Sequence, residues 1–233
     1  MPSYSEWQTK AQDWLSSNGF PPGLDAAKPL TPEEVATVKM YEKKISVGDI
    51  KGAFNAFAPT LDALDHEVYV PSMACAALHL ERCQPEKVLD AGCGIGIYTC
   101  FLAEMFPAVT FIGTDISNKS IERARGMAKD LPKSNHLFAV ADHRKISSMF
   151  GMHHFDVILS IAALHFEPQH HETIVRALVR TLQPGGFFLR EFPCNENIYH
   201  TWQGIYSRLD LRHVGAKGDD DQGHRSLIVY RKA

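Results

Sequence analysis

The sequence has 233 residues, of which 45% are hydrophobic and 22% charged, and its formal net charge is −3. A chain of this size and composition folds as one ordinary globular domain, with room for a small added subdomain, and is not disordered. No apolar run approaches the ~20 residues of a membrane span, and the slightly acidic balance gives no overall basic surface for nucleic acid.

Further features bear on location and on metal binding. The amino terminus lacks a basic segment followed by an apolar one, so we expect a cytoplasmic protein with no nucleic-acid or membrane partner. Five cysteines, an odd number without a C-x-x-C pair, predict reduced thiols. The histidine pairs at 153–154 and 170–171 have no matching partners at ligand spacing, so we expect no metal site.

Residues 1–80 predict a series of helices. Between residues 5 and 17 the apolar residues, two tryptophans among them, recur at helical spacing and form one face. Thr31 and the following proline begin a second helix that runs to about residue 47. Asp49 caps a third helix, and Pro71 opens a fourth.

From Lys87 onward the pattern alternates between strands and helices. Strands are expected near residues 87–91, 109–115, 136–140, 155–161 and 185–191, and amphipathic helices at 117–131 and 195–207. Such alternation predicts a parallel sheet covered by helices on both faces. The segments 209–216 and 226–230, joined by a short polar loop, predict a final hairpin.

The first of these strands ends in a glycine-rich turn before a helix. Gly92, Gly94 and Gly96 let the backbone bend and let a ligand approach the free N–H groups of the helix start. A dinucleotide fingerprint, G-x-G-x-x-G, requires glycine where this sequence has Ile97. Asp90 adds a negative charge that repels pyrophosphate and favours an amino group or a sulfonium.

An acidic residue also ends the second strand. Asp115 comes 19 residues after Gly96, close to the ~20 expected for an acid that binds ribose hydroxyls. The two motifs support each other, since a nucleoside ligand needs both.

The glycine turn, Asp115, Asp142 after the third strand and the Leu182–Gly186 turn together resemble the class I S-adenosylmethionine-dependent methyltransferases. The resemblance covers about residues 70–233. It implies an α/β fold with a Rossmann-like seven-stranded sheet, an antiparallel last strand and a helical N-terminal lid. We expect residues 1–80 to form this lid and substrate region and residues 81–233 the methyltransferase domain.

The resemblance also implies site residues. Asp142 is placed like the family residue that accepts a hydrogen bond from the adenine amino group. In the segment from Ser160 to Pro168, the backbone is expected to hold the methionine amino group, and the later residues are expected to face the methyl group. The lid contributes Tyr41 and Tyr69 as candidate substrate contacts, with the Phe54/Phe57 pair beside them, although each could equally be a core aromatic. The implied cofactor-binding set is Asp90, Gly92, Cys93, Gly94, Gly96, Asp115, Ile116, Asp142, His143 and Ser160.

Methyl transfer depends mainly on holding the acceptor in line, so a general base is optional. His165 is the first candidate for a base and a substrate contact, because imidazole titrates near neutrality; a histidine that only shapes the pocket is as good an interpretation. Glu191 is the second candidate, with Arg190 as an alternative ion-pair partner for it. Cys194 is better explained as a packing residue than as a nucleophile.

The expected function is transfer of a methyl group from S-adenosylmethionine to an oxygen or nitrogen of a small molecule, by a monomer or homodimer. No Asn/Asp-Pro-Pro-Tyr segment follows the fourth strand, which disfavours methylation of nucleic-acid bases. Two alternatives stay open. The acceptor could be a protein or peptide side chain, or the chain could be a non-catalytic scaffold protein that binds S-adenosylmethionine.

Overall fold

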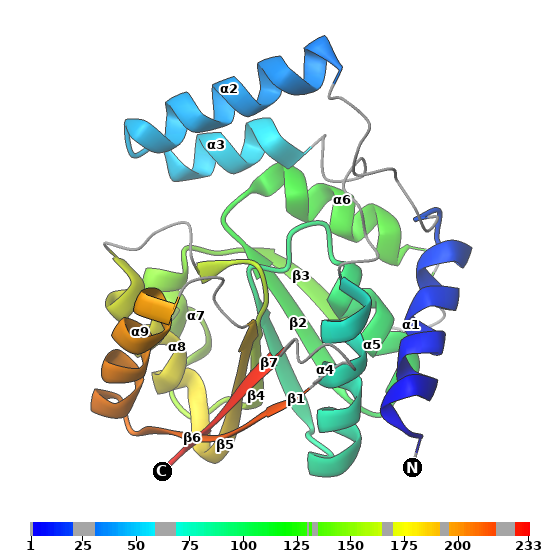
Figure 1. Cartoon of the computed structure of the whole chain (residues 1–233), viewed down its shortest axis with the longest axis vertical. Helices are drawn as coiled ribbons and strands as arrows, with labels where there is room; N and C mark the ends of the chain where they lie inside the picture. Colours follow the sequence, from blue (N-terminus) through cyan, green and yellow to red (C-terminus); the bar gives the residue numbers. More distant parts are fainter. Residues whose placement is uncertain are drawn as a thin grey trace.

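A computed structural model describes residues 2–20, 31–58, 69–129, 131, 135–164, 170–191, 196–217 and 227–233. Its centre is a seven-stranded sheet with the order β3-β2-β1-β4-β5-β7-β6 (Figure 1). The strands are β1 (Lys87–Ala91), β2 (Thr110–Asp115), β3 (His136–Val140), β4 (Phe155–Ser160), β5 (Leu182–Glu191), β6 (Leu211–Lys217) and β7 (Leu227–Lys232).

The first five strands are parallel, and β7 lies antiparallel between β5 and β6. This arrangement confirms the predicted Rossmann-like sheet with an antiparallel last strand. It differs in one detail, because β5 begins at Leu182 rather than at residue 185. Phe155 pairs with Leu182 across a register shift, which draws the predicted Leu182–Gly186 turn into the strand.

Helices cover both faces of the sheet (Figure 1). One hydrophobic cluster includes residues of α1 (Tyr4–Ser17), α4 (Val70–Cys83), α5 (Ile97–Met105) and α6 (Asn118–Ala128). The other includes residues of α7 (Ile146–Phe150), α8 (His171–Thr181) and α9 (Glu196–Arg208). The two clusters meet the sheet from opposite sides and fix the strand ends between them.

Helix α1 belongs to the first cluster. Its Trp7 and Trp14 are buried, and their indole N–H groups donate to Glu81 and Glu104 at 3.1 and 2.7 Å. The Trp7 ring stacks on Phe106 with centroids 5.5 Å apart. The apolar face read from the sequence is therefore part of the core beneath the sheet.

Helices α2 (Pro32–Ser46) and α3 (Ile50–Phe57) pack on each other and stand above α6, and neither contributes to the two clusters (Figure 1). Asn55 attaches α3 to the start of α6, because its side-chain amide donates to Asn118 Oδ1 and its oxygen accepts from Ser117 Oγ, at 3.1 and 2.8 Å. Within the predicted N-terminal region, α1 and α4 are thus built into the core and α2–α3 form a separate layer.

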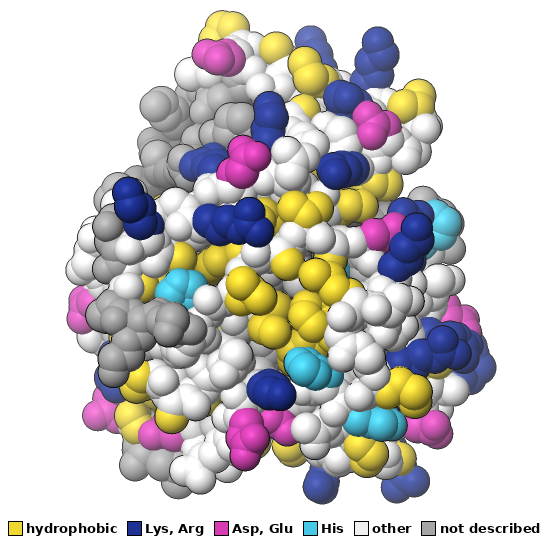
Figure 2. Space-filling model, turned by 180° about the vertical axis from the view of Figure 1, so that it is seen from behind, with side chains coloured by type: hydrophobic (Ala, Val, Ile, Leu, Met, Phe, Trp, Pro, Cys, Tyr) yellow, Lys and Arg dark blue, Asp and Glu magenta, His cyan; other side chains and the backbone are white. Residues whose placement is uncertain are grey.

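The view from behind shows how side-chain types are distributed on that face (Figure 2). Hydrophobic side chains gather in the middle of the face, below the α2–α3 pair, and Lys and Arg are interspersed with Asp and Glu around them. Among the described residues, no helix combines the length and apolar character that crossing a membrane requires.

Candidate active site

A cavity of about 210 Å³ opens at the carboxyl ends of β1, β2 and β4. The strand order reverses between β1 and β4, and ligands of open α/β sheets bind at such a switch point. It is lined by the glycine turn after β1, by Asp115 at the end of β2 and Ile116 after it, by His143 after β3 and by residues 161–164 after β4. Phe54 and Phe57 of α3 and Tyr69 before α4 line the side toward the N-terminal region.

The glycine turn passes very close to the segment after β4. Gly92 has φ +89°, and a Cβ added there would lie 2.2 Å from the Ala163 Cβ. Only glycine fits both this backbone conformation and this contact. The N–H groups of Gly92 and Cys93 donate to the Thr114 carbonyl at 2.8 and 3.0 Å. Gly96, also at φ +89°, does not line the cavity and instead starts α5.

Asp115 ties together the turns that follow β1 and β2. Its Oδ2 accepts from the Gly94 N–H at 3.0 Å and its Oδ1 from the Ser117 N–H at 2.8 Å. Burial raises the pKa of Asp115, and these backbone donors oppose that rise. The result is a carboxylate held rigidly at the wall of the cavity, with lone pairs left for hydroxyl donors.

Asp90 lies behind the turn and not at the cavity wall. It is 2% exposed, and its Oδ2 accepts from Thr99 Oγ1 at 2.7 Å. Burial raises the pKa of Asp90 to about 7. Its charge therefore acts on a ligand through the glycine turn and not by direct contact.

After β3 the structure separates two neighbouring predicted residues. The Asp142 carboxylate forms an ion pair with the Arg144 guanidinium at 2.7 Å, which lowers its pKa, and does not line the cavity. His143 does line it, and its Nε2 is 3.1 Å from Thr114 Oγ1. Burial lowers the pKa of His143 to about 4, so the imidazole is neutral near pH 7.

Some of the aromatic residues on the N-terminal side of the cavity line it, and one lies behind the lining. The Tyr69 and Tyr98 rings both line the cavity, with centroids 5.7 Å apart, and Tyr98 Oη is 2.6 Å from Ser72 Oγ. Tyr41 lies behind the lining, where its ring meets those of Phe54 and Phe57 at 5.7 and 5.2 Å. Tyr41 thus supports the two phenylalanines.

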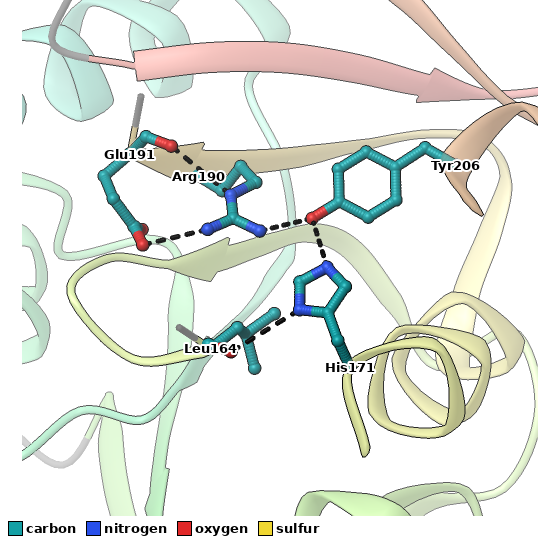
Figure 3. A network of polar contacts seen from close by, with 5 residues as sticks. All are labelled: Leu164, His171, Arg190, Glu191 and Tyr206. Atoms are coloured by element: carbon teal, nitrogen blue, oxygen red, sulfur yellow. Dashed lines mark hydrogen bonds and ion pairs between the residues drawn. The ribbon is translucent and has the colours of Figure 1, made fainter. Parts of the chain in front are cut away.

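Glu191 ends β5 and belongs to a buried polar network (Figure 3). Its Oε1 accepts from Arg190 Nη2 at 3.0 Å, so Arg190 is its ion-pair partner. Arg190 also donates to the Tyr206 hydroxyl, and His171 Nε2 lies 3.1 Å from that hydroxyl. The other ring nitrogen of His171 is 3.4 Å from the carbonyl of Leu164, a residue at the cavity wall.

The network has only one consistent direction. Arginine can only donate and a carbonyl can only accept, so the Tyr206 O–H donates to His171 Nε2 and His171 Nδ1–H donates to Leu164. Burial, and Arg190 beside it, lower the pKa of His171 to about 4, in agreement with a neutral ring. The Arg190 guanidinium is fully buried, and its Cζ lies 3.5 Å from the centroid of the Trp202 ring.

The structure therefore brings together part of the set predicted from the sequence. Ser160 is fully buried beside Arg190 in the sheet register and is absent from the described cavity lining. His165 lies outside the described residues. Helical spacing on α9 indicates that Trp202 faces the protein interior, but nothing in the sequence indicates that its partner is the guanidinium of Arg190. The predicted residues that line the cavity are Gly92, Cys93, Gly94, Asp115, Ile116, His143 and Tyr69.

Comparisons with known proteins agree with this geometry. The family model described as a methyltransferase domain matches residues 88–186. A trans-aconitate 2-methyltransferase of Deinococcus radiodurans is 34% identical over 125 residues, 52% of this chain and 45% of that protein. A tRNA (guanine-N(7)-)-methyltransferase of Chloroflexus aggregans is 34% identical over 118 residues, 45% of this chain and 51% of that protein. The chain spans about half the length of these curated relatives.

A solved structure of a putative O-methyltransferase from Nostoc punctiforme is similar over 94% of this chain and 83% of its own, with a TM-score of 0.65 and 15% identity. The fold and the site thus define a Rossmann-like methyltransferase domain. Residues 88–186 therefore match a methyltransferase domain, and S-adenosylmethionine is the cofactor of such domains.

Proposed function

We propose that this protein is an active enzyme that transfers a methyl group from S-adenosylmethionine to an oxygen or nitrogen of a small molecule. The observation that carries the proposal is the cavity at the switch point. One wall presents the glycine turn and the Asp115 carboxylate, and the other presents the rings of Phe54, Phe57 and Tyr69. The first wall suits a nucleoside and the second an acceptor.

The protein's own residues suit the cofactor. The cofactor supplies an activated methyl group on a positively charged sulfur. Asp115 at the cavity wall would accept hydrogen bonds from a ribose diol, and the neutral His143 ring and Ile116 would contact a base with flat and apolar surfaces. The buried carboxyl of Asp90 adds negative potential behind the turn.

The contribution of the protein to the rate is then mainly positioning. Holding the acceptor in line with the methyl group can supply most of the acceleration, and the apolar wall keeps water out. The predicted base Glu191 ends β5, pairs with Arg190 at 3.0 Å and is absent from the described cavity lining, so its role in taking a proton from the acceptor stays a prediction from the sequence. His165 stays the other candidate from the sequence.

Other acceptor classes fit the site less well. The names of the relatives include both small-molecule and tRNA methyltransferases, so the choice rests on the site itself. No Lys or Arg is among the described residues that line the cavity, whereas a nucleic-acid acceptor needs cations for its phosphates. A protein or peptide acceptor needs an open groove, and this cavity is narrow and walled by aromatic rings.

Titration calorimetry with S-adenosylhomocysteine and NAD tests the cofactor assignment. We expect the first to bind and the second not to bind. Asp115→Ala should weaken the binding of S-adenosylhomocysteine by about 1–3 kcal/mol, the range for losing hydrogen bonds to a charged group. Asp156→Ala is the matched control, since the Asp156 carboxylate also accepts from two backbone N–H groups, at 2.9 Å each, but at the opposite end of the strands. Equal losses in both variants would remove Asp115 from the site.

A further inference from the structure

The acceptor side of the cavity is built from aromatic rings. Phe54 and Phe57 come from α3, Tyr69 from the residue before α4, and Tyr98 from α5. Edge-on contact fixes Tyr69 against Tyr98, and Tyr41 supports both phenylalanines from behind. Rigid aromatic walls favour flat apolar ligands, because the rings gain area and stacking without losing much side-chain freedom.

Among the described residues, this side of the cavity has no Lys or Arg that is available to a ligand. No Lys or Arg is among the described lining residues, and His143 is neutral because burial lowers its pKa to about 4. Arg190 is fully buried, and Glu191, Tyr206 and the Trp202 ring already occupy its guanidinium.

Apart from the sulfur of the cofactor, the charged groups of the described residues at this site are acidic. Asp115 lines the cavity. Burial is the main cause of the raised pKa of Tyr98, and the nearby carboxylates of Asp90 and Glu191 raise this pKa further. A carboxylate ligand placed here would lose its hydration and meet like charges without a compensating donor pair. The site therefore discriminates against anionic acceptors.

We propose that the methyl acceptor is an uncharged aromatic compound that carries a hydroxyl group, bound between α3 and Tyr69. This inference rests on the proposed function. In the transfer, a lone pair of the acceptor oxygen forms the new C–O bond. The electron pair of the broken C–S bond stays on sulfur, and the hydroxyl proton leaves to water.

A panel of matched acceptors tests the charge and the ring separately. We expect the methyl ester of a hydroxybenzoate to be methylated with a kcat/KM about 100-fold above that of the free hydroxybenzoate anion, in line with the cost of an unpaired buried charge. Trans-aconitate, an anion without a ring, should give no product. The readout is S-adenosylhomocysteine formation with methylated product detected by mass spectrometry.

A pair of variants at Phe57 tests whether the acceptor binds beside α3. Phe57→Arg should reduce the preference for the ester at least about 10-fold by supplying a cation for the anion, whereas the size-matched Phe57→Leu should keep that preference. Calorimetry with S-adenosylhomocysteine on each variant checks that the cofactor side is intact. Equal rates on ester and anion, or faster turnover of trans-aconitate, would overturn the acceptor class.

The remaining outcomes separate the two proposals. Tight binding of S-adenosylhomocysteine with no product from any neutral aromatic hydroxyl compound would contradict the acceptor class and leave the cofactor assignment standing. Failure of the wild-type protein to bind S-adenosylhomocysteine would contradict the proposed function, and the acceptor class with it.

Discussion

The Tyr206 hydroxyl is the central link of the network that joins β5 to the cavity wall, and its removal should lower the free energy of unfolding. In Tyr206→Phe, Arg190 loses the acceptor of one guanidinium N–H, and His171 Nε2 loses its donor. Both Arg190 and Tyr206 are 0% exposed, so water cannot replace the lost bonds. An unpaired buried donor costs about 1–3 kcal/mol, and more when it is charged, so we expect a loss of ~3 kcal/mol.

Urea unfolding and a thermal scan measure this loss. For a chain of this length ~3 kcal/mol corresponds to a fall in Tm of roughly 6–12 °C. Tyr230→Phe is the matched control, because the Tyr230 hydroxyl accepts from the neutral amide of Gln203 at 2.8 Å and that amide is only partly buried. We expect the control to lose about 1 kcal/mol. If Tyr206→Phe were no less stable than Tyr230→Phe, the Tyr206 hydroxyl would not be a needed hydrogen-bond acceptor for the buried Arg190 guanidinium.

Other predictions concern the cavity and its surroundings. Gly92→Ala should abolish S-adenosylhomocysteine binding in calorimetry and cost at least about 1–3 kcal/mol of stability, because the new Cβ meets Ala163 at 2.2 Å; Gly151→Ala, with a similar φ of +79° and open space, should keep binding. Burial lowers the pKa of His143 from 6.5 to about 4, so the stability that the neutral ring contributes is complete above pH 6.5 and lost as pH falls toward 4. The stability difference between the wild type and His143→Asn, from urea unfolding, should therefore shrink over that range, and a constant difference would contradict the assignment. Amide exchange across residues 32–57 should slow when S-adenosylhomocysteine binds while exchange in α1 stays unchanged, and equal exchange with and without ligand would show that α2–α3 are not a ligand-dependent cover.

The local chemistry of the chain was sufficient for most of the fold. Alternating apolar strands and amphipathic helices depend on residue spacing alone, and this is why a parallel sheet covered by helices and a final hairpin could be predicted. The glycine turn and Asp115 were readable for the same reason, since the φ of +89° at Gly92 and a carboxylate after β2 are properties of short segments. The seven-stranded Rossmann-like sheet with its antiparallel last strand was implied by the family resemblance.

The tertiary structure decided which of these residues reach the cavity. Asp90 and Gly92 are two positions apart, yet Asp90 is still in β1 and buried, whereas Gly92 is in the turn that follows and lines the site. Asp142 and His143 also differ, because Asp142 pairs with Arg144 and only His143 lines the cavity. Arg190 contacts Tyr206 and Trp202 of α9, and Tyr206 contacts His171 of α8, so the network forms only when both helices pack on β5. Sequence by itself thus determined the sheet, the turn and the class of cofactor. Long-range packing decided the environment of each charge and the aromatic wall of the cavity, because burial and pairing depend on contacts between distant segments.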